Sequence, residues 1–416
     1  MKVALLSQVF ERNMGYLENF LPKYLARLGV EVHVITTDLP PYYHIKDELK
    51  ETYEGFADAS NLVAGTIEEI QGFTLHILPH KRVLGHMRMV GLLSKLRSIR
   101  PDIVQGTHVI GWTPLEAALA RPFLGYKLFS GNHYHASVFP LSNRELSIWS
   151  KDLLICRITR TLPGWLGSLF TERCYAIAPD CADVASRFFG VPKTKIDVCP
   201  LGVDTELFSP ISSREEEEDR RNLRKRLGFS TSDIVCIYTG RFSDGKNPLL
   251  LARAVTQLVE QGESFRGLFV GNGMQAKAIQ SCPGCVVHPF VSVENLAPLY
   301  RASDIGVWPT QESTSMLDAA ACGLPIVANN SMSVAERLDG NGVAYRLNDL
   351  DDLLRALLSL RVPGVRAGMG AAGSEKVARI FSWESVARQR LRDYEKVLRS
   401  TTPRGERTVS KEQLQS

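Results

Sequence analysis

The sequence predicts an α/β protein made of two doubly wound halves, each with a parallel sheet between helices. Three observations support this: a strand–helix–strand opening in residues 1–36, a second alternation of strands and helices from residue 233, and a turn-rich segment at residues 200–215 between them. With 416 residues, the chain is long enough for two domains with separate cores. Because doubly wound sheets bind ligands at the carboxyl ends of their strands, we expect the site in a cleft between the halves.

The first half is predicted as a domain over residues 1–205, and it opens with a βαβ unit. Residues 3–6 form an apolar run, and apolar side chains then recur at helical spacing until Gly29, which ends the helix. Residues 31–36 resume as a strand, so a parallel sheet covered by helices is expected. Further strands of this half are expected at 102–106 and 127–131.

The second half is predicted as a domain over residues 206–382, and it repeats the pattern. Its charged segment, residues 214–226, places acidic and basic side chains four apart, which indicates a solvated helix. The polar residues 400–416 predict a disordered tail. Strands of this half are expected at 233–240, 267–271, 304–309 and 324–328.

The composition is that of a soluble globular protein, with 44% hydrophobic and 23% charged residues. A net charge of +4 is too small for a dedicated nucleic-acid binder, but it is compatible with an anionic membrane face. No apolar run approaches the roughly 20 residues of a membrane span, and the first residues fit a strand better than a signal peptide. The scattered cysteines indicate reduced thiols, so a cytoplasmic protein is expected.

A pair of cations follows the first strand of the second half. The segment GRFSDGKN places Gly240 and Arg241 at the end of the strand and Lys246 five residues after Arg241. Two cations at this edge can bind a diphosphate and stabilise the charge that builds on it as a glycosyl bond breaks. The alternative is two surface cations beside a turn.

The second candidate is a polar loop that enters a helix near residues 313–315. Serine and threonine at a helix start expose backbone N–H groups that an anion can use. The carboxylates of Glu312 and Asp318 can accept hydrogen bonds from sugar and ribose hydroxyls. The alternative is an N-cap cluster with Asp318 on a solvated face. The donor-binding residues predicted here are Ser313, Thr314, Ser315, Met316 and Asp318.

Two groups in the first half complete the candidate site. Gly15 lies in the turn before the first helix and lets the backbone approach a ligand, with Tyr16 beside it as a candidate acceptor contact. His133 and His135 follow a strand and are placed to face the cleft, where a histidine can bind acceptor or polarise an oxygen. His108 is a further acceptor candidate. Core or loop histidines are the alternative, and a zinc site made of the three has no other support.

In combination, these segments resemble glycosyltransferase family 4, the retaining GT-B enzymes, over nearly the whole chain. The similar segments are GYLENFLPKYLARLGVEVHVIT, PLGVDTELFSP, TGRFSDGKN, LFVGNG, HPFVSVENLAPLYRASDIGVWP, CGLPIVA and FSWESVARQRLRDYEKVL. The resemblance implies two Rossmann-like domains, with donor binding mainly by the second and acceptor binding mainly by the first. It also implies that a C-terminal helix, residues 383–399, crosses back to the first domain.

Carried over by position, the resemblance assigns roles to individual residues. Arg241 and Lys246 match the diphosphate clamp of the family, and Gly15 matches its glycine loop. His133 matches the histidine beside the reacting sugar. Gly271 and Gly273 match a glycine turn that lines the nucleotide pocket. The catalytic set predicted in this way is His133, Arg241, Lys246 and Glu312.

One departure from the family pattern affects the donor loop. The family has two glutamates with seven residues between them, whereas Glu312 and Asp318 have five between them, and Asp318 stands for the second glutamate. Asp318 is assigned to the ribose and Glu312 to the donor sugar. No metal or other cofactor is expected. The Asp-x-Asp at residues 349–351 precedes an apolar helical stripe, so it reads as a helix start.

The predicted function is therefore retaining, metal-independent transfer of a hexose-type sugar from a nucleotide-diphosphate sugar to a glycan or lipid-linked acceptor, in cell-surface polysaccharide, lipopolysaccharide or glycolipid synthesis. An epimerase or hydrolase of the same fold and a non-catalytic sugar-nucleotide-binding module remain alternatives. An NAD-type oxidoreductase is disfavoured because no G-x-G-x-x-G opens either half.

The basic residues 80–100, together with Trp112, Trp149, Trp165 and Phe170, suggest peripheral contact with the inner face of the membrane. The alternative is that the helix in this segment packs on the sheet and keeps a solvated cationic face.

Overall fold

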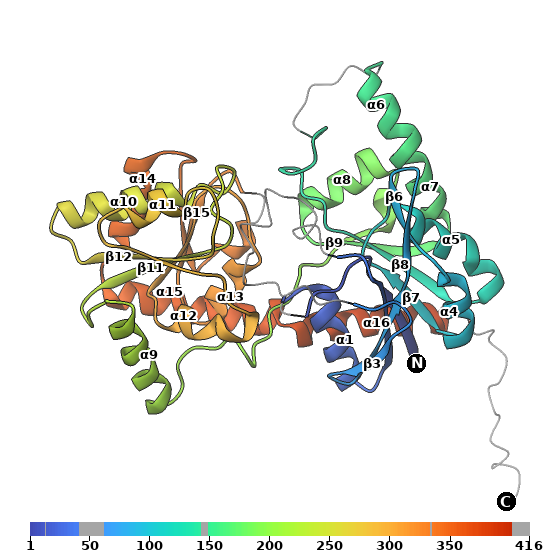
Figure 1. Cartoon of the computed structure of the whole chain (residues 1–416), viewed down its shortest axis with the longest axis horizontal. Coiled ribbons are helices and arrows are strands. Elements are labelled where there is room, and N and C mark those ends of the chain that lie inside the picture. The colour runs from blue at the N-terminus through green and yellow to red at the C-terminus, as the bar shows by residue number, and fades with distance from the viewer. Residues whose placement is uncertain (13, 41–61, 143–148, 333–334, 402–416) are drawn as a thin grey trace, which may run out of the picture.

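The computed structural model describes residues 1–12, 14–40, 62–142, 149–332 and 335–401. They form two lobes side by side, each organised around one sheet (Figure 1). The N-terminal lobe holds an eight-stranded sheet and the C-terminal lobe a six-stranded sheet. The predicted α/β class with two doubly wound halves is therefore what the chain forms.

The sheet of the N-terminal lobe has the strand order β10-β9-β8-β7-β1-β2-β4-β3. All neighbours are parallel except β3 and β4, which pair antiparallel at one edge. Strands β1, β2 and β7 are buried apolar runs, as a sheet covered on both faces requires. The bounds are β1 Lys2–Leu6, β2 Glu31–Thr37, β3 Ile67–Ile70, β4 Phe73–Leu78, β7 Ile103–Gly106, β8 Lys127–Asn132, β9 Thr171–Ala176 and β10 Ile196–Val198.

Helices cover both faces of this sheet and form a separate apolar core on each. Side chains of α1 and α16 pack with one face, and those of α4 and α5 pack with the other. A small hairpin, β5 His80–Val83 with β6 His86–Met89, lies beside α5. The helices are α1 Leu17–Arg27, α4 Leu92–Ile99, α5 Trp112–Leu124, α6 Lys151–Cys156, η1 Arg157–Thr161, α7 Leu162–Leu169, α8 Pro179–Phe189 and η2 Lys193–Lys195.

The sheet of the C-terminal lobe is parallel throughout, in the order β13-β12-β11-β14-β15-β16. Its strands are β11 Ile234–Thr239, β12 Phe265–Val270, β13 Cys285–His288, β14 Ile305–Trp308, β15 Ile326–Asn329 and β16 Gly342–Tyr345. Its helical elements are α9 Arg214–Arg226, α10 Pro248–Glu260, α11 Ala276–Gln280, η3 Val293–Asn295, α12 Ala297–Arg301, α13 Ser315–Ala321, η4 Ala335–Arg337, α14 Leu350–Ser359, α15 Pro363–Lys376 and η5 Val377–Phe381. The predicted helix start at residues 349–351 is confirmed, because Asp349 caps α14 by accepting from the Asp352 backbone N–H at 2.9 Å.

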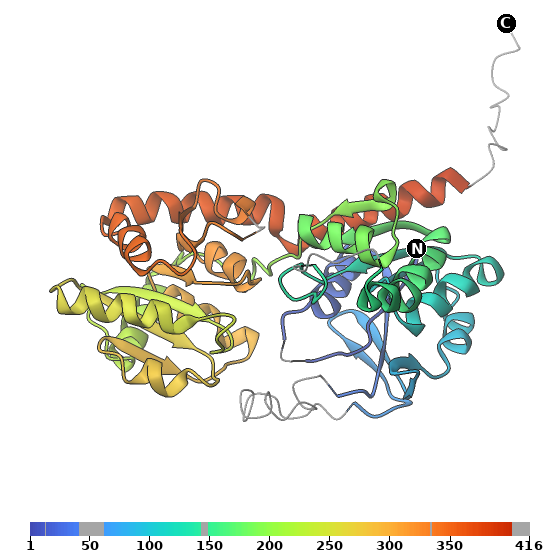
Figure 2. The same ribbon diagram turned by 90° about the horizontal axis from the view of Figure 1, so that it is seen from above.

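The last helix, α16 (Trp383–Thr401), returns to the N-terminal lobe and packs against α1 (Figures 1 and 2). Buried Tyr394 donates a hydrogen bond from its hydroxyl to Gln105 on β7. The helix continues to Thr401, so the tail predicted from residue 400 begins too early. Residues 402–416 of that tail lie outside the described residues.

The chain segment that joins the lobes is tied to α1. Asp204 accepts hydrogen bonds from Lys23 Nζ at 2.6 Å and from the Tyr24 hydroxyl at 2.9 Å. Next to it, Val203 pairs with Ser382, so the two crossings between the lobes lie side by side. Candidate site residues follow directly after the carboxyl ends of strands β8, β11 and β14.

Candidate functional site

A cleft of about 490 Å³ lies between the two lobes and is lined by segments from both. It brings together most of the residues predicted from the sequence, although they come from loops far apart in the chain. Those in its lining are Gly15, Tyr16, His135, Gly240, Arg241, Lys246, Glu312, Ser313, Thr314, Ser315 and Asp318. The carboxyl ends of the strands in each lobe therefore meet at one site, as expected for doubly wound sheets.

Two cations from the C-terminal lobe lie on one side of the cleft. Arg241 follows the end of β11, and Lys246 stands in the turn before α10. Burial and the charge of Arg241 lower the pKa of Lys246, while Glu312 opposes the shift. A pair of cations that is desolvated and mutually repelling is stabilised when a diphosphate enters between them.

Gly271 and Gly273 pack against the loop that carries Arg241. Both have positive φ angles, and a Cβ on Gly271 would lie 2.0 Å from the carbonyl oxygen of Gly240. A Cβ on Gly273 would lie 2.7 Å from the carbonyl oxygen of Phe242. The two glycines are not among the described residues that line the cleft, and their contact with the nucleotide stays a prediction. Their small size lets the clamp loop pack closely on β12.

Glu312 reaches across the cleft to the N-terminal lobe. Its carboxylate accepts a hydrogen bond from the Ser137 hydroxyl at 2.9 Å and lies 3.3 Å from Nδ1 of His135. From below, Arg337 donates to the backbone carbonyl oxygen of Ser313 at 2.7 Å. Arg337 is 3% exposed and lines the cleft, so it braces the loop that carries Glu312.

His135 is oriented by a carboxylate. Asp180, in the first turn of α8, lies 3.0 Å from Nδ1 of His135 and accepts the backbone N–H of Ala136 at 2.9 Å. Potential metal ligands of His135, Asp180 and Cys181 lie within 4.8 Å of one another. Burial raises the pKa of the Cys181 thiol. The hydrogen bonds of His135 and of the Ala136 backbone to Asp180 hold the His135 ring in place.

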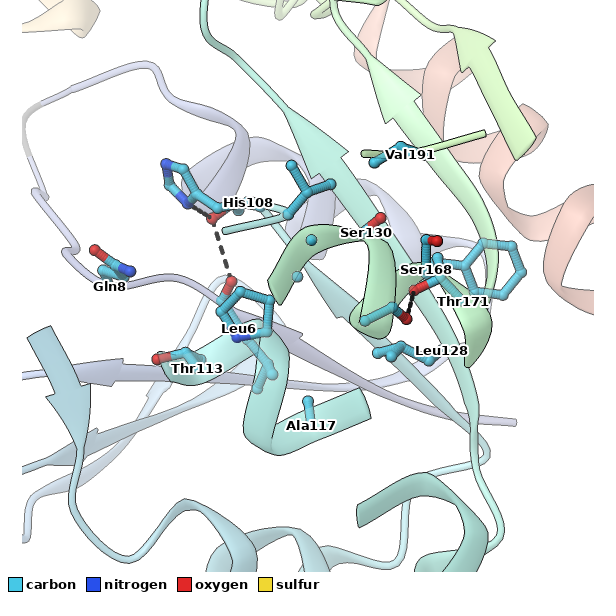
Figure 3. A pocket seen from close by; sticks show the side chains of 17 residues that line it. Leu6, Gln8, His108, Thr113, Ala117, Leu128, Ser130, Ser168, Thr171 and Val191 are labelled. Carbon is cyan, nitrogen blue, oxygen red and sulfur yellow. Dashed lines mark hydrogen bonds between the residues drawn. The ribbon is translucent and has the colours of Figure 1, made fainter. Parts of the chain in front are cut away.

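His133 and His108 stand apart from the cleft lining that the structure describes. Their rings lie 6.1 Å apart, and burial lowers the pKa of His133 to about 3 and that of His108 to about 4, so both are neutral at pH 7. His108 lines a separate small pocket of about 20 Å³ between β7, β8, α5 and α7 (Figure 3). Of the two histidines in the GNHYH segment, His135 is the one that lines the cleft, and the place of His133 beside the reacting sugar stays a prediction.

The first turn of α13 divides its side chains between the cleft and the core. Asp318 lines the cleft, and burial raises its pKa to about 7, while Arg337 opposes this and Asp204 adds to it. Met316 is fully buried in the apolar core of the C-terminal lobe. The Met316 side chain therefore belongs to the core and does not line the cleft, and a contact of this residue with the donor stays a prediction.

Three residues around the cleft were missed by the sequence analysis: Ser137, Asp180 and Arg337. Each belongs to a segment without a recognisable motif, and each contacts a site residue more than 20 positions away in the chain. Asp180 lies at the start of a helix, shortly after a strand, and this position could have identified it as a candidate site residue. No comparable signal marked Arg337.

Family models match both lobes. One described as Glycosyltransferase Family 4 matches residues 21–207, and one described as Glycosyl transferases group 1 matches residues 233–361. The D-inositol 3-phosphate glycosyltransferase of Rhodococcus erythropolis (strain PR4) is 29% identical over 245 residues, which cover 54% of this chain and 54% of the relative. That of Nocardiopsis dassonvillei is 28% identical over 404 residues, 89% of this chain and 86% of the relative. The chain spans about half the length of the first curated relatives it matches.

Solved structures share the two-lobed architecture. Sucrose-phosphate synthase from Thermosynechococcus elongatus superposes with a TM-score of 0.67 at 16% identity, over 96% of this chain and 100% of that chain. Anabaena HepE, in complex with UDP and glucose, gives a TM-score of 0.65 at 15% identity, over 95% and 99%. These likenesses show the GT-B fold with its two Rossmann-like domains.

Proposed function

The chain belongs to glycosyltransferase family 4, and from this premise we propose that it transfers a hexose-type sugar from a nucleotide-diphosphate sugar to a glycan or lipid-linked acceptor. The transfer retains the configuration of the sugar and uses no metal. We further propose a role in the synthesis of cell-surface polysaccharide, lipopolysaccharide or glycolipid.

One arrangement carries this proposal: two cations and two carboxylates from the C-terminal lobe face residues of the N-terminal lobe across one cleft. Arg241 and Lys246 suit a diphosphate, since charge-assisted hydrogen bonds to phosphate are short and strong. Glu312 suits the hydroxyls of the donor sugar, and Asp318 suits the ribose. A non-catalytic module has no need of a carboxylate held across the cleft against His135 and Ser137.

In the proposed reaction, the bond between the sugar C1 and the β-phosphate oxygen breaks, and a bond from C1 to the acceptor oxygen forms on the same face. The acceptor proton passes to the departing phosphate. Arg241 and Lys246 stabilise the charge on the leaving diphosphate, so they act mainly on the transition state. A cation pair of this kind supplies the electrostatic stabilisation that a divalent metal supplies in other transferases.

The donor site can be tested with a thermal-shift panel of UDP, GDP, ADP, dTDP and CMP, with and without EDTA. We expect one nucleoside diphosphate to raise the Tm, because binding to the native state alone stabilises by about 2.7 kcal/mol at a hundred times Kd. EDTA is expected to leave the shift unchanged. Stabilisation that EDTA abolishes would refute the metal-independent site, and no shift with any nucleotide would refute the donor site.

The raised pKa of Asp318 predicts a pH-dependent donor affinity. If the ionised carboxylate accepts the ribose hydroxyls, the affinity for the donor is highest above pH 7 and falls below it by up to about tenfold per pH unit, since protonation replaces the charged acceptor with a weaker neutral one. Calorimetric titration of the stabilising nucleotide between pH 5.5 and about 8.5 measures this slope.

The matched control for this titration is Asp318→Asn, which keeps the size of the side chain and removes its ionisation. The nucleotide phosphates also titrate, with a pKa near about 6, and the variant retains that contribution. The slope of the variant is therefore expected to be shallower than that of the unaltered protein. Equal slopes would remove Asp318 from the nucleotide site.

A further inference from the structure

The helical segment α6–η1–α7, residues 151–169, has its large apolar side chains on the outside. Leu154, Ile155, Ile158, Leu162, Trp165, Leu166 and Leu169 are all exposed. They recur every three to four residues, so they form one continuous stripe along the segment. A helix on the surface of a water-soluble protein has the opposite pattern, with its apolar stripe against the core.

The inner side of the same segment combines small residues with one leucine. Gly164, Ser168 and Cys156 are buried against the lobe, and Leu153 is partly buried against the same apolar cluster as Cys156. A Cβ on Gly164 would lie 2.1 Å from the carbonyl oxygen of Phe189, so the helix approaches α8 more closely than any larger residue would allow. The exposed apolar side chains take no part in this attachment to the lobe.

The stripe continues onto neighbouring segments. Helix α5 packs against α7 and exposes Leu119 and Phe123, the latter 86% exposed. Trp149, just before α6, is 87% exposed. Figure 1 shows α6 projecting beyond α8 at the end of the N-terminal lobe, with α5 and α7 on the same outer side. We call this surface, formed by the exposed apolar residues of α5 and residues 149–169, the apolar face.

Positive charge accompanies the apolar face. Residues 150–170 carry the cations Lys151, Arg157 and Arg160 against the single carboxylate Asp152. The neighbouring hairpin adds exposed Lys81 and Arg82, with Leu84 at its turn. Anionic lipids attract basic segments at about 1 kcal/mol per cation near the surface.

The apolar face overlaps in part with the surface that the sequence suggested for membrane contact. Helix α4 lies within residues 80–100, and its apolar side, formed by Leu92, Leu96 and Ile99, is buried. Trp112 is partly buried and donates its ring N–H to the carbonyl oxygen of Val83 at 2.9 Å. Of the four aromatic residues named, Trp149 and Trp165 are exposed. Within the described part of the chain, no helix is both long and apolar enough to cross a bilayer.

We propose that the apolar face docks onto an anionic phospholipid bilayer, with α6–η1–α7 lying in the plane of the interface and its stripe among the acyl chains. A second copy of the chain fits this surface less well, because both contacting faces would carry the same excess of positive charge. The docking does not depend on the proposed function. If both hold, the docking favours the lipid-linked acceptor over the glycan.

Co-sedimentation with vesicles of phosphatidylcholine, with and without phosphatidylglycerol, tests the docking. The unaltered protein is expected to bind the vesicles that contain phosphatidylglycerol. The combined variant Ile158→Ser, Leu162→Ser and Leu166→Ser should weaken this binding at least about tenfold, since three buried apolar side chains are lost. The matched control is Met274→Ser, Val362→Ser and Ile380→Ser, three exposed apolar residues elsewhere in the chain, which should bind normally.

A second variant, Lys151→Glu with Arg157→Glu, separates the role of charge. It should lose the preference for phosphatidylglycerol, and the binding of the unaltered protein should weaken as salt increases. The thermal shift by the donor nucleotide should be unchanged in every variant, which distinguishes failed docking from a failed donor site.

The docking is overturned if the unaltered protein does not sediment with the vesicles or if the three-serine variant binds them as well as the control does. Light scattering tests the other possible occupant of the apolar face, a second copy of the chain, by measuring the oligomeric state. A dimer that the three-serine variant converts to a monomer, without vesicle binding, would identify the apolar face as a contact between two copies.

Discussion

Replacing Lys246 with alanine is expected to lower kcat by about 10²–10³-fold, which corresponds to roughly 3–4 kcal/mol of transition-state stabilisation. The ammonium group lines the cleft beside Arg241, and burial and Arg241 hold its pKa below the ordinary value. A leaving diphosphate gains more from this desolvated cation than the bound substrate does, because its negative charge increases as the glycosyl bond breaks. Initial rates at saturating donor measure the effect.

Lys277→Ala is the matched control for this variant. Lys277 is an exposed lysine of the same lobe, at the start of α11, and its removal should leave kcat unchanged. Thermal unfolding should be similar in both variants, since neither side chain is part of the apolar core. A Lys246→Ala enzyme with unaltered kcat would show that the clamp is a pair of surface cations beside a turn.

Replacing Glu312 with glutamine is expected to lower kcat/KM for the sugar nucleotide by about 10²-fold, or roughly 2.7 kcal/mol. Glutamine keeps the shape of the side chain but loses the charge that strengthens hydrogen bonds from sugar hydroxyls. The affinity for the free nucleoside diphosphate should change little, because Glu312 is assigned to the sugar rather than to the phosphates. Steady-state kinetics and calorimetry together separate the two quantities.

Ser137→Ala distinguishes a role in sugar binding from a role in holding the lobes together. The Ser137 hydroxyl donates to Glu312 at 2.9 Å across the cleft, so its removal breaks this bridge and leaves the carboxylate in place. A loss of no more than about fivefold is expected, because an exposed hydrogen bond contributes roughly 0.5–1 kcal/mol. If Ser137→Ala were as damaging as Glu312→Gln, the importance of Glu312 would lie in closing the cleft.

The two doubly wound halves could be predicted because their strands and helices follow local rules. The apolar run of β1, the helical spacing of α1 and the glycine that ends it are visible without any knowledge of the partner strands. The position of two cations at the cleft was predictable for a similar reason. Arg241 and Lys246 follow a buried strand closely, and such positions collect at the carboxyl edge of a parallel sheet.

For other residues, the sequence could not predict whether the side chain lines the cleft, because this depends on contacts between segments far apart in the chain. The GNHYH segment placed two histidines after β8, but the packing of His133 with His108 and of His135 with Asp180 decided which ring lines the cleft. Met316 and Asp318 lie two residues apart on α13, and their orientation toward core or cleft follows from how the helix sits on its sheet. Arg337 became visible only through its contact with Ser313.

The sequence by itself determined the fold class, the family and the loops that line the cleft, because apolar periodicity, turn residues and motif spacing are local properties of the chain. Tertiary structure alone decided the bridge from Glu312 to Ser137 and His135, the supporting role of Gly271 and Gly273, and the outward apolar stripe of α6–η1–α7. A helical stripe has the same spacing whether it faces a core or solvent. Its direction is set by which side can approach the lobe, and here the small Gly164 and Ser168 provide that side.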